Sequence, residues 1–174
     1  MDGILTVHMA HPLAGGASRV NEDTVPPARF VPGAEPRFAV GAESTSGGGG
    51  VREFTFRLAD LPAVRDFAAS CARRLGYDED FINDFLLAIN EVATNAVTHG
   101  ADKGEIRIWP GGERRLFVAV HDSGRWAPKG TPGSTPPAPN ATSGMGLWVA
   151  RKLASSITFA TGSTGTTVTM GFEA

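Results

Sequence analysis

The chain has 174 residues, which fits one ordinary domain, or one domain with a tail. Its 16 Lys and Arg against 18 Asp and Glu give a formal net charge of −2, which argues against a broad basic surface for nucleic acid and against a polybasic membrane anchor. A single cysteine, Cys71, excludes an internal disulfide framework and a multi-thiolate metal site.

The 22 Gly and 12 Pro are more than a compact domain of this size needs, and they gather in two places. Residues 1–50 hold nine of the Gly and five of the Pro, end in four consecutive glycines and show no sustained helical or strand periodicity. This composition predicts a flexible, largely disordered tail over 1–50 and a folded domain over 51–174. A second concentration over 124–146 predicts a long loop of the kind that often forms a lid.

The first apolar run of the tail is short, is interrupted by His8 and follows Asp2 where a signal peptide needs a basic start. No window reaches the eighteen or so apolar residues of a membrane span. We therefore expect a cytoplasmic protein.

Residues 51–58 alternate loosely and predict a strand. Asp60 is placed to begin a helix that Gly76 ends. Cys71 falls in the apolar stripe of this helix, which favours a packed core thiol over a reactive one. That stripe consists of Val64, Phe67, Ala68, Cys71 and Leu75.

A second helix is predicted from Asp78 or Asp80 to Gly100, with a strongly apolar side. Its polar side carries Glu91 and Asn95, which are four residues apart and can therefore reach one ligand. A solvated polar face explains the same pattern, so the helix alone identifies no site.

A hairpin follows over 105–109 and 115–121, and its second strand is expected to be buried on both faces. This strand ends at Asp122, before the long loop. A third helix over 146–154 and a closing hairpin over 156–161 and 166–172 complete the chain. The order predicts an α+β fold: a two-layer sandwich with a mixed, mostly antiparallel sheet and helices on one face.

Three polar features could meet at a nucleotide. Asp122 at a strand end can accept a hydrogen bond from an exocyclic amine, although a turn residue explains it equally well. Gly144 and Gly146 precede a helix N-terminus, where free N–H groups favour phosphate, and a flexible loop exit is the alternative. Asn95 offers a neutral oxygen to Mg²⁺, and Glu91 can accept a proton from an attacking hydroxyl.

In order and spacing these features resemble the GHKL superfamily of ATP-binding domains, which includes gyrase, heat-shock chaperone, histidine kinase and MutL. The resemblance covers about 51–172 and implies the Bergerat fold with a long ATP lid. The matching segments are Glu91-Val92-Ala93-Thr94-Asn95-Ala96-Val97-Thr98-His99 (N box), Asp122-Ser123-Gly124, Gly144-Met145-Gly146-Leu147 and Gly165-Thr166-Thr167-Val168.

Within the superfamily the chain is most similar to RsbW-type anti-sigma-factor serine kinases. The resemblance implies ATP and Mg²⁺ as cofactors, with Glu91 as general base and Asn95 as cofactor and metal ligand. It further implies that Asp122 binds the adenine amine, with Gly124 beside the base and Thr166 supporting it. Gly144 and Gly146 would hold the phosphates beneath the lid, with Met145 and Leu147 counted among the cofactor-binding residues.

Proteins of this type phosphorylate a STAS-domain anti-anti-sigma partner, sequester a sigma factor and are commonly homodimers. The resemblance implies the same partners here, with no direct nucleic-acid or membrane contact. Nothing upstream resembles the dimerisation helices of a histidine kinase.

One departure favours an alternative, a non-catalytic ATP-dependent binding module: Arg125-Trp126 follow Gly124 where the fuller glycine box has a second glycine. Trp126 either shields the adenine or anchors the loop. We expect His99 to be structural, and Arg151 and Lys152 to be surface charges.

Overall fold

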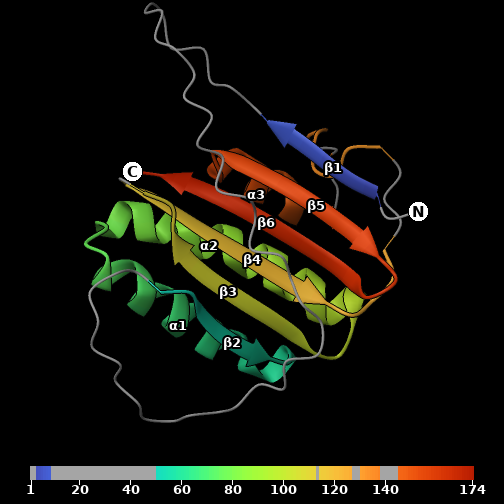
Figure 1. Cartoon of the computed structure of the whole chain (residues 1–174), viewed down its shortest axis with the longest axis horizontal. Coiled ribbons are helices and arrows are strands. Elements are labelled where there is room, and N and C mark those ends of the chain that lie inside the picture. The colour runs from blue at the N-terminus through green and yellow to red at the C-terminus, as the bar shows by residue number, and fades with distance from the viewer. Residues whose placement is uncertain (1–2, 9–49, 113, 127–129, 138–144) are drawn as a thin grey trace, which may run out of the picture.

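The computed structural model describes residues 3–8, 50–112, 114–126, 130–137 and 145–174. Two layers are visible in it, a sheet and a set of helices (Figure 1). The elements in chain order are β1 (Gly3–His8), β2 (Arg52–Phe56), the 3₁₀ turn η1 (Leu58–Asp60), α1 (Leu61–Arg74), α2 (Glu79–Asn95), the π-helical turn η2 (Ala96–Gly100), β3 (Gly104–Pro110), β4 (Arg115–Asp122), α3 (Gly146–Leu153), β5 (Ser156–Gly162) and β6 (Gly165–Glu173).

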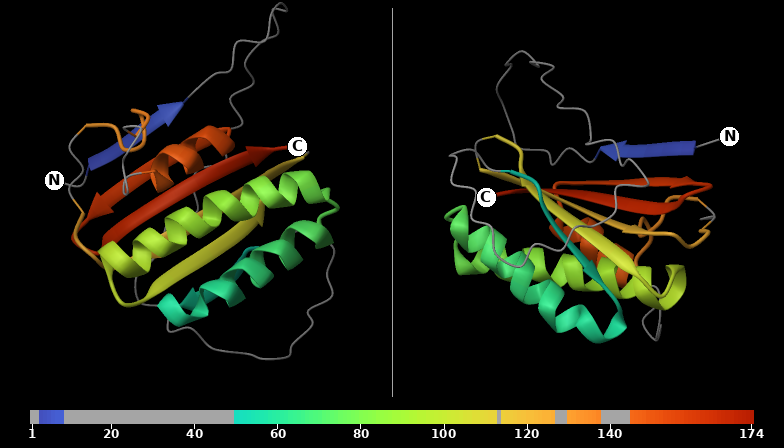
Figure 2. Two further views of the ribbon diagram at one scale, coloured as in Figure 1. Left: turned by 180° about the vertical axis from the view of Figure 1, so that it is seen from behind. Right: turned by 60° about the horizontal axis from the view of Figure 1, so that its bottom comes forward.

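The described strands form one sheet in the order β1-β5-β6-β4-β3-β2, with α1, α2 and α3 on the same face (Figure 2). The predicted two-layer α+β sandwich is confirmed. The expectation of a mixed sheet is wrong, because every neighbouring pair is antiparallel. β4 and β5, which the α3 crossover joins, do run parallel, but β6 lies between them.

The core lies between the sheet and the apolar side of α2, the helix with the clearest apolar periodicity in the sequence. Phe85 and Ile89 of α2 are fully buried, and the Phe85 ring meets Phe172 of β6 edge to face at 5.0 Å between centroids. Burying each such side chain contributes about 2 kcal/mol to folding. Cys71 of α1 is buried beside this core, as predicted, and burial raises the pKa of its thiol.

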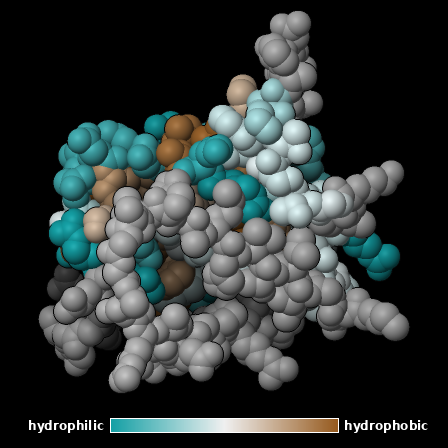
Figure 3. Space-filling view, turned by 90° about the horizontal axis from the view of Figure 1, so that it is seen from above, coloured by the Kyte–Doolittle hydropathy of each residue, from teal (hydrophilic) through white to brown (hydrophobic). Residues whose placement is uncertain are grey.

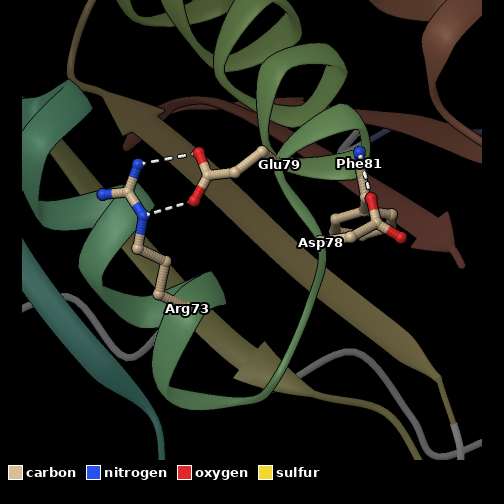
Figure 4. A network of polar contacts seen from close by, with 4 residues as sticks. All are labelled: Arg73, Asp78, Glu79 and Phe81. Atoms are coloured by element: carbon tan, nitrogen blue, oxygen red, sulfur yellow. Dashed lines mark hydrogen bonds and ion pairs between the residues drawn. The ribbon is translucent and has the colours of Figure 1, made fainter.

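The turn between α1 and α2 is held by two local contacts (Figure 4). Asp78 is the N-cap of α2 and accepts a hydrogen bond from the Phe81 N–H at 2.8 Å, which decides between the two predicted caps. The Arg73 guanidinium donates to both carboxylate oxygens of Glu79 at 2.8 and 2.9 Å. This pair is exposed, so the cap contributes more to the turn than the pair does.

β4 differs from its prediction, which was burial on both faces. Along this strand the side chains facing the helices are buried, whereas Phe117, Ala119 and His121 on the opposite face are only half-buried. The reason is that all three helices cover one face, so an apolar run such as Leu116–Val120 does not require two covered faces. Phe117 instead stacks on Trp109 of β3 at 5.7 Å between ring centroids.

β1 corrects part of the expected disordered tail. Gly3–His8 pairs antiparallel with β5 over six residues and forms one edge of the sheet. Local composition does not reveal this strand, because its hydrogen-bond partners lie some 150 residues further along the chain. Residues 1–2 and 9–49 of the predicted tail lie outside the described residues.

Viewed from above, the coloured part of the surface is largely hydrophilic, with a small hydrophobic group in its middle (Figure 3). None of the described helices has both the length and the apolar composition needed to cross a membrane.

Candidate nucleotide-binding site

A cavity of about 490 Å³ opens where the ends of four elements converge: η2 after α2, the end of β4, the start of β6 and the start of α3. Its lining combines apolar side chains with a few polar groups, as is usual for ligand sites. The lining residues are Val92, Asn95, Ala96, His99, Gly100, Val120, Asp122, Trp126, Pro132, Gly133, Gly146, Leu147, Thr166 and Val168.

Gly100, Asp122 and Thr166 form one side of this cavity, which we call the floor. Asp122 and Thr166 are directly opposite each other in the antiparallel β4–β6 ladder, so the strand register alone places them together. Gly100 arrives from α2 through η2, a wider turn in which the Ala101 N–H donates to the Ala96 carbonyl at 2.9 Å. Such π-turns frequently occur at functional sites.

Asp122 is a buried carboxylate at the bottom of the cavity, with 7 % of its surface exposed. Burial raises the pKa of its carboxyl, while a hydrogen bond from the Gly124 N–H at 2.8 Å and the nearby His121 act in the opposite direction. One carboxylate oxygen, Oδ1, is thus hydrogen-bonded to the backbone. The carboxylate retains further acceptor capacity for a donor in the cavity.

The Thr166 hydroxyl is the one buried side-chain polar atom without a hydrogen-bond partner among the described residues. An unpaired buried hydroxyl costs about 1–3 kcal/mol, so such a group calls for a ligand or water. Its place beside Asp122 in the cavity fits a ligand that presents polar edge atoms, such as a purine base.

Glycines allow the close approaches that build the floor. A Cβ at Gly100 would overlap the Asp122 carboxylate, and one at Gly124 would overlap the Gly100 backbone. Gly165 has φ +128°, and a Cβ there would meet the Asp122 and Ser123 backbone. Gly124, a predicted site residue, does not itself line the cavity but supports the floor.

Glu91 and Asn95 lie where α2 packs against the start of α3. A Cβ at Gly146 would be 2.6 Å from Glu91 Oε2 and 3.4 Å from Asn95 Nδ2, so a side chain larger than hydrogen would disturb this contact. Asn95 lines the cavity, whereas Glu91 is not part of its lining but lies beside Gly146, which is. The two side chains therefore share one end of the site, at the N-terminus of α3.

α3 begins at Gly146, and its first residues face the cavity. Leu147 lines the cavity and packs against the core, whereas Met145 is 51 % exposed and is not part of the lining. The free N–H groups at this helix N-terminus favour an anion. Gly144, the remaining predicted phosphate residue, lies outside the described residues.

Trp126, Pro132 and Gly133 come from the 124–146 segment and also line the cavity, and we call this part of the lining the outer wall. The Trp126 ring packs on Phe159 of β5 at 5.6 Å between centroids and also lines the cavity. It therefore contacts the core and faces the cavity at once, so the two roles weighed for it from the sequence are not exclusive.

Arg151 corrects a sequence-based expectation, because it is not a surface charge. It is 8 % exposed, and its Nε and Nη2 donate to the Pro132 carbonyl at 3.1 and 2.9 Å. Position 151 is one helical turn after Leu147, and this spacing could have revealed its inward orientation. Lys152 is exposed, as expected, with its ammonium 5.8 Å from the Trp148 ring centroid.

Of the predicted site residues, the cavity brings together Asn95, Asp122, Gly146, Leu147 and Thr166. Sequence reasoning missed Gly100, Pro132 and Gly133, and only the Gly and Pro content of the long loop hinted at the last two. His99, expected to be structural, is exposed and reaches the cavity mouth.

Residues 54–172 match the family described as "Histidine kinase-like ATPase domain". None of the curated proteins matches the sequence significantly. Among solved structures, the RsbU and RsbW domains of Rv1364c from Mycobacterium tuberculosis are similar with a TM-score of 0.55 and 23 % identity, over 71 % of this chain and 32 % of that one. The histidine kinase domain of a blue-light activated histidine kinase from Erythrobacter litoralis EL346 has a TM-score of 0.44 and 22 % identity. The match covers 65 % of this chain and 60 % of that one.

The match to the Mycobacterium tuberculosis structure is a likeness of fold, and the chain spans about a third of that protein's length. Together with the family match it confirms the predicted GHKL ATP-binding fold. The family implies ATP binding. The individual roles assigned to the site residues stay predictions.

Proposed function

Because the chain belongs to the histidine kinase-like ATPase domain family, we propose that it is an ATP-dependent protein serine/threonine kinase of the RsbW type. In this proposal it phosphorylates a serine or threonine of a STAS-domain anti-anti-sigma protein and sequesters a sigma factor. The fold likeness to a structure that contains an RsbW domain supports this choice within the family.

The observation that carries the nucleotide part of the proposal is the floor of the cavity. The buried Asp122 carboxylate and the unpartnered Thr166 hydroxyl belong to directly paired residues of β4 and β6. The rest of the cavity is lined mainly by apolar side chains. This arrangement suits a planar base that donates an amine hydrogen bond to Asp122 and meets apolar surface on its faces. Thr166 would complete the polar contacts of that base.

The phosphates would extend from the floor toward the N-terminus of α3, where the backbone N–H groups of Gly146 and Leu147 favour negative charge. Asn95, at the same end of the cavity, would hold Mg²⁺ through its side-chain oxygen, with phosphates and water as further ligands. The described residues contain no cluster of three or more His, Cys, Asp or Glu, so a cation here would depend on the nucleotide for most of its ligands. When bound, Mg²⁺ neutralises phosphate charge.

Glu91 is the proposed general base. The hydroxyl oxygen of the partner's side chain attacks the γ-phosphorus, the bond to the β–γ bridging oxygen breaks and ADP leaves, while Glu91 accepts the hydroxyl proton. Its place against Gly146, one helical turn from Asn95, supports this role.

The kinase proposal is tested by incubating the protein with Mg²⁺-ATP and STAS-domain proteins encoded in the same genome. We expect phosphate transfer to a serine or threonine of one of them. Glu91→Ala should lower the rate by about 10²–10⁴-fold, as loss of a general base does, and leave ATP binding largely unchanged. Asp84→Asn is the matched control, because Asp84 is an exposed acid on the same helix. Absence of transfer to every such partner would contradict the kinase assignment.

A second candidate is the non-catalytic binding module of the same fold. Two observations favour it: Arg125 and Trp126 replace the second glycine of the first glycine box, and Trp126 is engaged in packing on Phe159. In this case ATP would bind and change the capture of a partner without phosphate transfer. The two candidates share the nucleotide site and differ in whether Glu91 acts on a hydroxyl.

A further inference from the structure

The outer wall of the cavity is fastened to α3 by an arginine that the proposed chemistry does not use. Arg151 directs two N–H groups at one acceptor, the Pro132 carbonyl, at 3.1 and 2.9 Å. Its guanidinium carbon lies 5.8 Å from the centroid of the Phe159 ring. The guanidinium thus connects α3, β5 and the outer wall.

This guanidinium is buried without a carboxylate partner among the described residues. Burial lowers its pKa. Burying a cation lowers the free energy of unfolding unless the contacts of the cation compensate for its lost hydration. Here the compensation comes from a backbone carbonyl and from an aromatic ring, which a planar guanidinium can contact together.

The segment that Arg151 holds packs directly against the helix. Gly133, next to Pro132, has φ +68°, and a Cβ there would overlap the Leu147 carbonyl and lie 3.0 Å from the Trp148 N–H nitrogen. Pro132, Gly133 and Leu147 all line the cavity. The position of the wall relative to α3 therefore sets the width of the cavity at this end.

We propose that Arg151 is a positioning residue that holds the Pro132–Gly133 wall against α3, so that the retention of a bound nucleotide depends on it. Arg151 does not line the cavity, and it acts through Pro132 rather than by contact with the ligand. The inference rests on the proposed ATP site and adds to it the residue that shapes its wall.

The main test compares Arg151→Met and Arg151→Lys with Lys152→Met, a matched control on the next, exposed position of α3. The rate of dissociation of a fluorescent ATP analogue is measured by stopped flow. We expect Arg151→Met to release the analogue about 10-fold faster or more, the change expected on losing a charge-assisted hydrogen bond. Arg151→Lys should restore little of the slow, wild-type dissociation, because an ammonium keeps the charge but cannot make the paired contact and the ring contact together. Lys152→Met should match the wild type.

A second measurement does not depend on nucleotide. Hydrogen exchange of peptides covering 130–137 is followed in the nucleotide-free protein, with α2 peptides as the internal reference. Arg151→Met should raise exchange in 130–137 and leave α2 unchanged, which separates release of the wall from a general loss of stability.

The outcomes separate the two proposals. If the wild type binds no ATP, the proposed function fails, and the exchange of 130–137 still decides whether Arg151 holds the wall. If the wild type binds ATP and Arg151→Met keeps both the wild-type dissociation rate and the wild-type exchange, this inference is overturned. If Arg151→Met does not fold, Gly133→Ala replaces it as the main test. An added methyl at this position displaces the same wall, so unchanged nucleotide release in that variant would overturn the inference.

Discussion

The floor and the outer wall of the cavity are built by different means. The floor is fixed by backbone hydrogen bonds, because Asp122 and Thr166 are partners in the β4–β6 ladder and Gly100 and Gly124 touch through main-chain atoms. The outer wall is held by side chains: Trp126 packs on Phe159, and Arg151 bonds to Pro132.

This difference suggests that the floor and the outer wall have different roles in ligand binding. A floor set by a sheet ladder cannot move without breaking several cooperative hydrogen bonds, so it can provide the fixed polar contacts that recognise a base. A wall held by one guanidinium and one ring can shift at a much smaller cost, as is common for loops at binding sites. Substitutions that displace the backbone of the floor should therefore affect folding, and substitutions that displace the wall should affect ligand retention.

The largest effect is expected from comparing Gly165→Ala with Gly133→Ala. Both glycines have positive φ, and a Cβ at either position would meet backbone atoms. Gly165 is fixed between two strands, so Gly165→Ala should lower the free energy of unfolding by about 3 kcal/mol through strain and overpacking. Gly133→Ala should cost about 1–2 kcal/mol, little more than positive φ alone, because the wall can move away from the added methyl. Urea unfolding followed by circular dichroism measures both.

Gly112→Ala is the control for the backbone conformation alone. Gly112 has φ +86°, and a Cβ there would meet no atom within 4 Å. It should therefore show only the cost of positive φ, about 1–2 kcal/mol. If Gly165→Ala and Gly133→Ala lowered the free energy of unfolding by the same amount, the proposed distinction between floor and wall would be wrong.

The next effect concerns recognition at the floor. Asp122→Asn keeps the shape of the side chain and an oxygen that can accept from the Gly124 N–H, but it loses the negative charge. A charge-assisted hydrogen bond contributes about 1.5–3 kcal/mol, so we expect ATP affinity to fall roughly 10–100-fold. Isothermal titration calorimetry measures this, with Asp102→Asn at an exposed position as the control. Unchanged affinity in Asp122→Asn would contradict the assignment of the floor to the base.

The same contrast explains what the sequence could predict. The helices, the two hairpins and the end of β4 at Asp122 follow from local periodicity and turn residues. That Asp122 and Thr166 belong to one site was implied only by the resemblance to a known family, and their pairing in the β4–β6 ladder was not predicted, because register between distant strands is a non-local property. Of the three floor residues, Asp122 and Thr166 were thus predictable once the motifs were recognised, whereas Gly100 was missed.

The wall and the β1 edge were not predictable in the same way. Arg151 was expected at the surface because a cation in the last turn of a helix usually lies there. Its spacing from Leu147 indicated only which side of α3 it is on, and its acceptor, the Pro132 carbonyl 19 residues earlier, is a non-local partner. The β1 strand depends on the free edge of β5, which nothing in the first residues of the chain reveals. The sequence also gave no reason to select Pro132 or Gly133 from the long loop.

The smallest expected effect is a pH dependence of stability, which measures how much folding free energy the buried Asp122 carboxylate costs. Burial raises the pKa of Asp122 above its ordinary value of 3.8, so between that value and the higher folded-state value the native state holds more protons than the unfolded state. Stability attributable to this group must then fall as pH rises through that window, and it is fully present only below it. Asp122→Asn removes the titrating group, so the unfolding free energy of this variant minus that of the wild type should increase with pH across the window and become constant above it. Urea unfolding of both proteins at a series of pH values measures the difference, and a flat or decreasing difference would show that the floor holds its carboxylate at no cost to folding.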